Sequence, residues 1–144
     1  GANLMFFASD NTGPVHPKIM ERIIAVNHGP KMPYGTDVLM NEVHKKICDL
    51  FDAPEAIVYL VVSGTAANSL SLACNTQPWQ TVFCTQMAHI RADECNAPEF
   101  YSGGAKLTLV PSTGKMTPHE LTNAIEGKQA HGVHSAQRGP VSIT

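Results

Sequence analysis

The sequence is poor in charged residues and has no long apolar run. Lysine, arginine, aspartate and glutamate make up 15% of its 144 residues, against about 25% in an average soluble domain. The formal net charge is −2, and the ten lysines and arginines form no cluster, so nothing favours nucleic acid or an anionic membrane as a partner. No apolar run approaches the roughly 18 residues of a membrane-spanning helix. With 43% hydrophobic residues and so few charged ones, we expect much of the surface to be covered by something else.

The sequence also lacks closely paired cysteines and a recognisable signal peptide. Its four cysteines have irregular spacings, and none forms a C-x-x-C pair. We therefore expect reduced thiols, buried as small hydrophobic side chains, in a cytoplasmic protein. These cysteines are Cys48, Cys74, Cys84 and Cys95.

The order of apolar patterns predicts an α/β fold with a mostly parallel sheet. Residues 1–13 read as an irregular amino-terminal arm, and residues 14–52 carry two helices with one apolar face each. From residue 53 to 144 strands and helices alternate, which favours a parallel sheet covered by helices on both faces. The expected strands are 56–62, 81–85 and 106–110, and the expected helices are 65–75, about 92–100 and one from 118.

The last residues resemble the start of another strand. Val141–Thr144 follows an expected loop, Gln137–Pro140, and no helix comes after it. A parallel sheet left half covered would expose an apolar face and an unpaired edge. We therefore expect the sequence to be a piece of a larger protein.

The most informative segment joins the first expected strand to the next helix through Ser63-Gly64-Thr65. The first N–H groups of a helix have no partner within it, and the helix dipole adds partial positive charge there, so the junction suits a phosphate. The spacing matches neither G-x-G-x-x-G nor the P-loop, and no lysine follows. A single monoester phosphate fits such a short turn better. The alternative is a junction that binds nothing and uses Gly64 only for close packing.

His89 follows the expected strand 81–85, in the segment Gln86–Ile90. Ligands of open parallel sheets bind at the carboxyl ends of the strands, where Ser63–Thr65 are also expected. A phosphate-binding turn and an imidazole at one edge together predict a ligand site. The alternative for His89 is a loop histidine without a role.

Two other chemistries are not supported by the spacing. His89 lies close to Asp93, Glu94 and Cys95, but neither a zinc-type ligand pair nor the H-x-E…P-C-x-x-C pattern is present, so no metal is expected. His131 and His134 have no second ligand pair and are interpreted as surface residues. Ser63 is not in a G-x-S-x-G elbow, which speaks against a serine nucleophile.

Five separated segments, in order, resemble the threonine aldolases. These enzymes belong with the β-eliminating lyases, which use pyridoxal 5′-phosphate and have the aspartate aminotransferase fold, also called fold type I. The resemblance covers about residues 4–144 and corresponds to the amino-terminal part of such an enzyme's large, cofactor-binding domain. The segments are Phe7–Asn11, Met32–Gly35, Ser63–Asn68, Ala88–Ile90 with Asp93-Glu94, and Gly103–Leu107.

The resemblance implies roles for six residues. Gly64 and Thr65 would hold the 5′-phosphate of the cofactor, and His89 would stack on its pyridine ring and assist proton transfer from the substrate hydroxyl. Ser9 would help to bind the substrate carboxylate, Tyr34 would lie near the site and the subunit interface, and Glu94 would be a partner behind the first layer of site residues.

The implied reaction is the reversible cleavage of threonine or allo-threonine to glycine and an aldehyde. Histidine suits this reaction, because a base that works near neutral pH is needed at the β-hydroxyl. The resemblance further implies an enzyme of amino acid metabolism that acts as a homodimer or homotetramer.

One family feature finds no match. None of the lysines in this sequence has the setting of the family's Schiff-base lysine, so we expect these 144 residues alone to be inactive. Two alternatives stay open. One is another pyridoxal-phosphate lyase, of the tyrosine or tryptophan type, and the other is a non-catalytic domain that uses its sheet edge for protein association.

Overall fold

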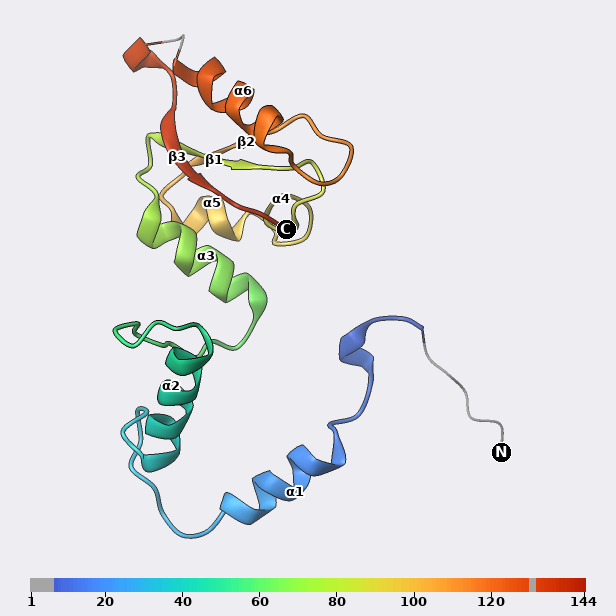
Figure 1. Cartoon of the computed structure of the whole chain (residues 1–144), viewed down its shortest axis with the longest axis vertical. Coiled ribbons are helices and arrows are strands. Elements are labelled where there is room, and N and C mark those ends of the chain that lie inside the picture. The colour runs from blue at the N-terminus through green and yellow to red at the C-terminus, as the bar shows by residue number, and fades with distance from the viewer. Residues whose placement is uncertain (1–6, 130–131) are drawn as a thin grey trace. The chain divides into compact units, whose positions relative to one another are not determined.

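The computed structural model describes residues 7–129 and 132–144. It contains two compact units whose boundary falls between Val58 and Tyr59. The first unit carries a short 3-10 helix, η1, and two α-helices (Figure 1). They are η1 (Asp10–Thr12), α1 (Pro17–Val26) and α2 (Val38–Leu50). Of the expected arm 1–13, residues 1–6 lie outside the described residues, and so does His131.

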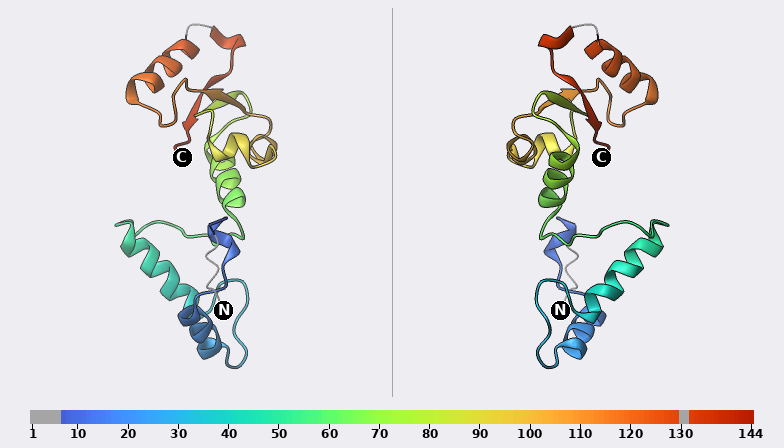
Figure 2. Two further views of the ribbon diagram at one scale, coloured as in Figure 1. Left: turned by 90° about the vertical axis from the view of Figure 1, so that its right-hand side faces the viewer. Right: turned by 90° about the vertical axis from the view of Figure 1, so that its left-hand side faces the viewer.

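The second unit is a parallel sheet with helices on both faces. The strand order is β2-β1-β3, and β1 pairs in parallel with both neighbours. Helices α3, α4 and α5 lie on one side of the sheet, and α6 lies on the other (Figures 1 and 2). The expected parallel α/β architecture is thus confirmed. The elements are α3 (Gly64–Asn75), β1 (Gln80–Cys84), α4 (His89–Ala92), α5 (Ala97–Tyr101), β2 (Lys106–Leu109), α6 (Pro118–Gln129), η2 (Gly132–His134) and β3 (Gln137–Val141).

Strand β1 is the centre of this unit. Four of its five residues are buried, since strands flank it on both edges and helices cover its faces. Its apolar side chains join α3 and the segment that follows the strand in one cluster, and removing such apolar surface from water is the main stabilising contribution. The cluster consists of Leu72, Val82, Cys84, Ala88 and Ile90, with Leu107 packed against it.

The prediction of a strand at 56–62 is wrong. This segment has no regular secondary structure. Its β-branched and aromatic side chains are largely exposed, and the Val62 side chain is fully exposed. A strand requires a neighbour for its ladder of hydrogen bonds, whatever its residue preferences. No strand pairs with this segment within residues 7–129 and 132–144.

The prediction of a single helix at about 92–100 is also wrong. The chain forms two short helices instead, and His89 begins the first of them rather than lying in a loop. The break falls at Cys95 and Asn96, which both have positive φ, 51° and 60°. Pro98 is the second residue of α5, where a missing N–H costs nothing because that group has no partner in the first turn.

Strand β3 begins earlier than expected, because Gln137–Pro140 is strand and not loop. Its register against β1 is irregular between Thr81 and Phe83, which accommodates a proline that cannot donate to the ladder. Gly139 also approaches β1 closely, since a Cβ there would lie 2.6 Å from the Thr81 carbonyl oxygen. The sequence predicted Gly139 and Pro140 to be loop residues, but in the structure they belong to a strand with a β-bulge.

The cysteines only partly match expectation. All four are free thiols. Cys48 and Cys84 are buried, but Cys74 and Cys95 are exposed, so the expected burial is wrong for those two.

Candidate functional site at the carboxyl end of β1

His89 lies just beyond the carboxyl end of the central strand. After Cys84 the chain turns, and the Ala88 N–H donates to the Thr85 carbonyl over 3.2 Å. Ala88 itself has no exposed surface and belongs to the apolar cluster. The core therefore fixes the residue immediately before His89, while the His89 side chain remains 53% exposed.

A buried carboxylate holds the imidazole. Nδ1 of His89 lies 2.7 Å from Oε1 of Glu94, and the Glu94 side chain is 0% exposed. The backbone supports this pair, since the Asp93 N–H donates to the His89 carbonyl over 2.9 Å and the Cys95 backbone then turns left-handed. Left-handed φ is uncommon for residues other than glycine, and such residues gather at functional sites.

Asn68 binds the same carboxylate from the other side. Its Nδ2 donates to Oε1 of Glu94 over 2.6 Å. The second carboxylate oxygen, Oε2, is buried and has no hydrogen-bond partner among the described residues. Because Asn68 belongs to α3, one turn after Thr65, the contact connects the start of α3 with His89.

The amino terminus of α3 is the candidate anion-binding end. Ser63 caps the helix, with its Oγ accepting from the Ala66 N–H over 3.2 Å. The hydroxyl of Ser63 thus serves the helix, and the N–H groups of Gly64 and Thr65 have no acceptor within it. A Cβ built on Gly64 meets no atom within 4 Å, and its φ is not left-handed. Neither packing nor backbone conformation in the described chain explains this glycine.

The sequence matches the family model for beta-eliminating lyases over residues 7–144. The chain belongs to the beta-eliminating lyase family. Two relatives in this family are each called "Low specificity L-threonine aldolase". The protein of Pseudomonas aeruginosa is 36% identical over 139 residues, and that of Pseudomonas sp. is 35% identical over 139 residues. The alignment covers 96% of this chain but 39% of each relative, so the chain spans about two fifths of their length.

Solved structures agree with the family. A threonine aldolase of Leishmania major superposes with a TM-score of 0.81 at 26% identity, over 92% of this chain and 38% of that one. A putative aromatic amino acid beta-eliminating lyase/threonine aldolase of Exiguobacterium sp. shares the fold, with a TM-score of 0.58 at 19% identity, over 76% of this chain and 32% of that one. The expected fold, that of the amino-terminal part of a threonine aldolase, is confirmed.

The two remaining expected site residues belong to the first unit of this family member. Ser9 precedes η1, and its carbonyl accepts from the Thr12 N–H and Oγ1 over 3.2 and 2.7 Å. Tyr34 is 99% exposed and has a left-handed φ of 62°, followed by Gly35 at 72°. The strained backbone of Tyr34 resembles that of Cys95 and is compatible with a functional turn.

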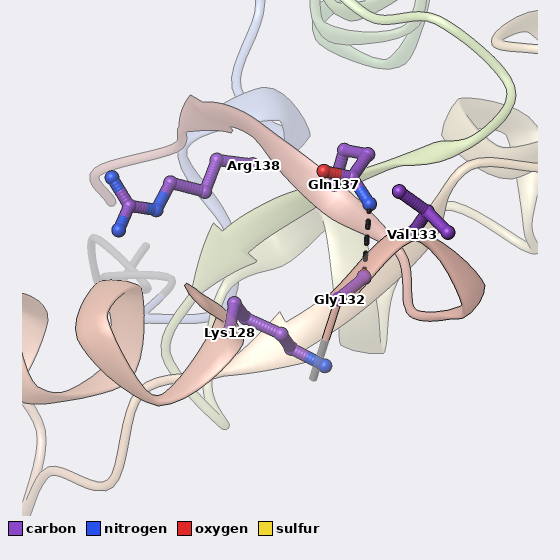
Figure 3. Close-up of a pocket in the computed structure, with 5 residues that line it drawn as sticks. All are labelled: Lys128, Gly132, Val133, Gln137 and Arg138. Carbon is purple, nitrogen blue, oxygen red and sulfur yellow. Dashed lines mark hydrogen bonds between the residues drawn. The ribbon is translucent and has the colours of Figure 1, made fainter. Parts of the chain in front are cut away.

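A hollow of about 420 Å³ in the second unit lies away from this site and is lined by residues of α6, η2 and β3 (Figure 3). Its lining includes Gln137 at the start of β3, so this hollow lies at the amino ends of the parallel strands, at the opposite end from His89.

No group of three potential metal ligands occurs within residues 7–129 and 132–144, and no described helix could span a membrane.

The sequence predicted His89 and Glu94 as site residues but gave no role to Asn68. The only hint was its place in the segment Ser63–Asn68, one helical turn after Thr65. Its partner is 26 residues further along the chain, and local patterns do not reveal contacts over that distance.

Proposed function

We propose that this chain supplies part of the active site of a pyridoxal-phosphate-dependent aldehyde-lyase that cleaves threonine or allo-threonine to glycine and acetaldehyde. The arrangement of His89, Glu94 and Asn68 beside the open start of α3 carries this proposal. It links a histidine, through Glu94 and Asn68, to the helix whose first N–H groups are proposed to bind the phosphate. The names of the Pseudomonas and Leishmania relatives support the same reaction.

The cofactor phosphate would bind at Gly64 and Thr65. Their backbone N–H groups point out of the helix start, the helix dipole favours an anion there, and the Thr65 hydroxyl adds a donor. The open space at Gly64 lets a phosphate oxygen approach the backbone. When bound, the cofactor supplies an electron-accepting ring that makes cleavage of the Cα–Cβ bond feasible.

His89 would take the proton of the substrate β-hydroxyl. The step converts an O–H into the carbonyl of the released aldehyde, so a base must hold that proton while the Cα–Cβ bond breaks. Glu94 would orient the imidazole and stabilise it once it is protonated. Ser9 would bind the substrate carboxylate, and Tyr34 would lie near the site at a subunit contact.

The whole protein is proposed to be a cytoplasmic homodimer or homotetramer. Exposed apolar side chains on α1 support a covered surface in the assembly: Ile19, Ile23 and Ile24 are each at least half exposed. We propose that the 144 residues alone are inactive, because none of their lysines has the setting of a Schiff-base lysine.

Gly64→Ala in the full-length protein tests the phosphate position. A Cβ there disturbs no described atom, so the thermal midpoint should stay unchanged while cofactor affinity falls about 10-fold, because the methyl group fills the phosphate space. The matched control is Gly127→Ala on α6, where a Cβ also meets no atom within 4 Å. Equal cofactor affinity of both variants would contradict the proposal.

Product analysis tests the reaction. Incubation with threonine should yield glycine and acetaldehyde in equal amounts, and His89→Asn should lower kcat by about 10²- to 10⁴-fold, as expected for loss of a general base. Phenol from tyrosine or indole from tryptophan would instead identify an elimination reaction, the alternative that the family description allows. Absence of any turnover by the cofactor-loaded protein would favour an association domain.

A further inference from the structure

We propose that Asn68 is a positioning residue that keeps His89 in a single tautomer, with the proton on Nδ1 and the lone pair on Nε2. The inference rests on the proposed function and deepens it, because it names the atom that would accept the substrate proton. It also assigns a task to a residue that binds neither the phosphate nor the substrate.

Two side chains converge on one oxygen. Oε1 of Glu94 lies 2.6 Å from Nδ2 of Asn68 and 2.7 Å from Nδ1 of His89. An amide NH₂ group is purely a donor, and an ionised carboxylate oxygen is purely an acceptor. If Oε1 accepts from both sides, Nδ1 must carry a proton. A neutral imidazole has only one N–H, so Nε2 is then the basic nitrogen.

The burial pattern separates the fixed end of this network from its reactive end. The Glu94 side chain has no exposed surface, so water does not compete for Oε1, and hydrogen bonds are stronger in such surroundings. The His89 side chain is 53% exposed and therefore accessible to a substrate. The carboxylate would hold the ring from inside the protein while Nε2 stays available.

The Asn68 amide favours this tautomer through the charge of Glu94. Its NH₂ group donates to Oε1, and such a hydrogen bond is stronger when the carboxylate is ionised. An ionised Glu94 has no proton to donate, so its hydrogen bond with Nδ1 requires the imidazole proton on Nδ1. Without the Asn68 donor, a protonated Glu94 could donate to Nδ1 and leave the imidazole proton on Nε2. The basic nitrogen would then face Glu94 and not the substrate.

Asn68 also belongs to the helix that would bind the phosphate, so a trivial structural role must be distinguished from positioning. If Asn68 merely anchored α3, its loss would weaken cofactor binding. If it acts through Glu94 and His89, its loss should change the imidazole tautomer and kcat but leave the N–H groups of Gly64 and Thr65 in place. These two effects are measured separately.

The test uses the full-length protein with ¹⁵N-labelled histidine, in which His89→Asn identifies the His89 resonances. Wild type should show the Nδ1–H tautomer. Asn68→Ala should show a mixture of tautomers and a kcat for threonine about 10-fold lower, with cofactor affinity changed less than twofold. The matched control is Asn75→Ala, at the other end of α3, where the amide donates to the Ser71 carbonyl over 2.8 Å. This control should behave as wild type.

Several results would overturn the inference. They are an Nε2–H tautomer in wild type, an unchanged tautomer in Asn68→Ala, and a loss of cofactor affinity that equals the loss of kcat. Asn68→Asp keeps the size and replaces the donor by an acceptor, so it must also lose the wild-type imidazole spectrum even where the alanine variant fails to fold. The tautomer is read without turnover, so a protein that keeps it but does not cleave threonine would contradict the proposed function and not the positioning.

Discussion

Nδ1 of His89 lies 2.7 Å from Oε1 of Glu94, which joins an exposed imidazole to a carboxylate with no exposed surface. His89 begins the short helix α4, and Glu94 follows the end of this helix, five positions later. A buried carboxylate is costly unless it is hydrogen-bonded, and here both of its hydrogen-bond partners come from candidate site elements. Local structure of this kind is difficult to explain by packing alone.

Replacing Glu94 with glutamine should therefore damage catalysis more than folding. The substitution keeps the size of the side chain but removes the charge that stabilises protonated His89, and the amide can turn its NH₂ toward Nδ1. We expect kcat for threonine to fall on the order of 10²-fold, in the direction seen when a histidine loses its orienting carboxylate. Steady-state kinetics with saturating cofactor measure this change. Glu126→Gln on α6 is the control, and equal kcat values for the two variants would rule out the role of Glu94.

Gly139 should be required for the pairing of β1 with β3. A Cβ at this position would lie 2.6 Å from the Thr81 carbonyl oxygen and 3.2 Å from Cβ of Gln80. Neither neighbour is the end of a flexible side chain, so the strands must separate. We expect Gly139→Ala to lower the free energy of unfolding by about 1–3 kcal/mol, measured by urea denaturation. Gly127→Ala should instead raise it by up to about 1 kcal/mol, because alanine is the better helix former.

Gly139 also shows where sequence reasoning reached its limit. The parallel sheet, the helix after Ser63 and the helix after Thr117 were predictable, because caps and apolar spacing act over a few residues. The bulge was not, since Gly139 and Pro140 favour a loop until a neighbouring strand is present. The prediction of a strand at 56–62 was wrong for the opposite reason. Its residue preferences are clear, but the described chain offers no partner.

In the candidate site too, some features could be predicted from the sequence and others could not. His89 follows from the rule that ligands bind at the carboxyl ends of parallel strands. Gly64 and Thr65 follow from the unpaired N–H groups at the start of the helix after Ser63. The contact between Asn68 and Glu94 depends on how α3 packs beside the segment after β1, and no local pattern encodes that packing. Long-range contacts of this kind must be read from the structure.

The cysteines should differ sharply in reactivity. Cys74 and Cys95 are exposed, whereas Cys48 and Cys84 are buried, and burial raises the pKa of the Cys84 thiol. Because the thiolate is the reactive form, Cys84 should resist iodoacetamide until the protein unfolds. Mass spectrometry of timed samples should show modification first at Cys74 and Cys95. Early modification of Cys84 would contradict its place in the core.

The start of α6 should contribute a stability that depends on pH. Oε2 of Glu120 accepts from the N–H and the Oγ1 of Thr117, both over 2.8 Å, and these hydrogen bonds lower the pKa of Glu120 from its usual 4.5. Because the folded pKa lies below the unfolded one, the stabilisation is fully present above pH 4.5 and is lost as the pH falls through the lower, folded value.

The loss of unfolding free energy between pH 7 and pH 3 should then be smaller in Glu120→Gln than in wild type, because glutamine does not titrate. Thr117→Ala removes the hydroxyl but keeps the backbone N–H, so its pH dependence should be intermediate. Thr117→Ser retains both donors and should match wild type. Urea denaturation at a series of pH values measures all four proteins. If Glu120→Gln lost as much stability on acidification as wild type, the hydrogen bonds at this helix start would not be the source of the pH dependence.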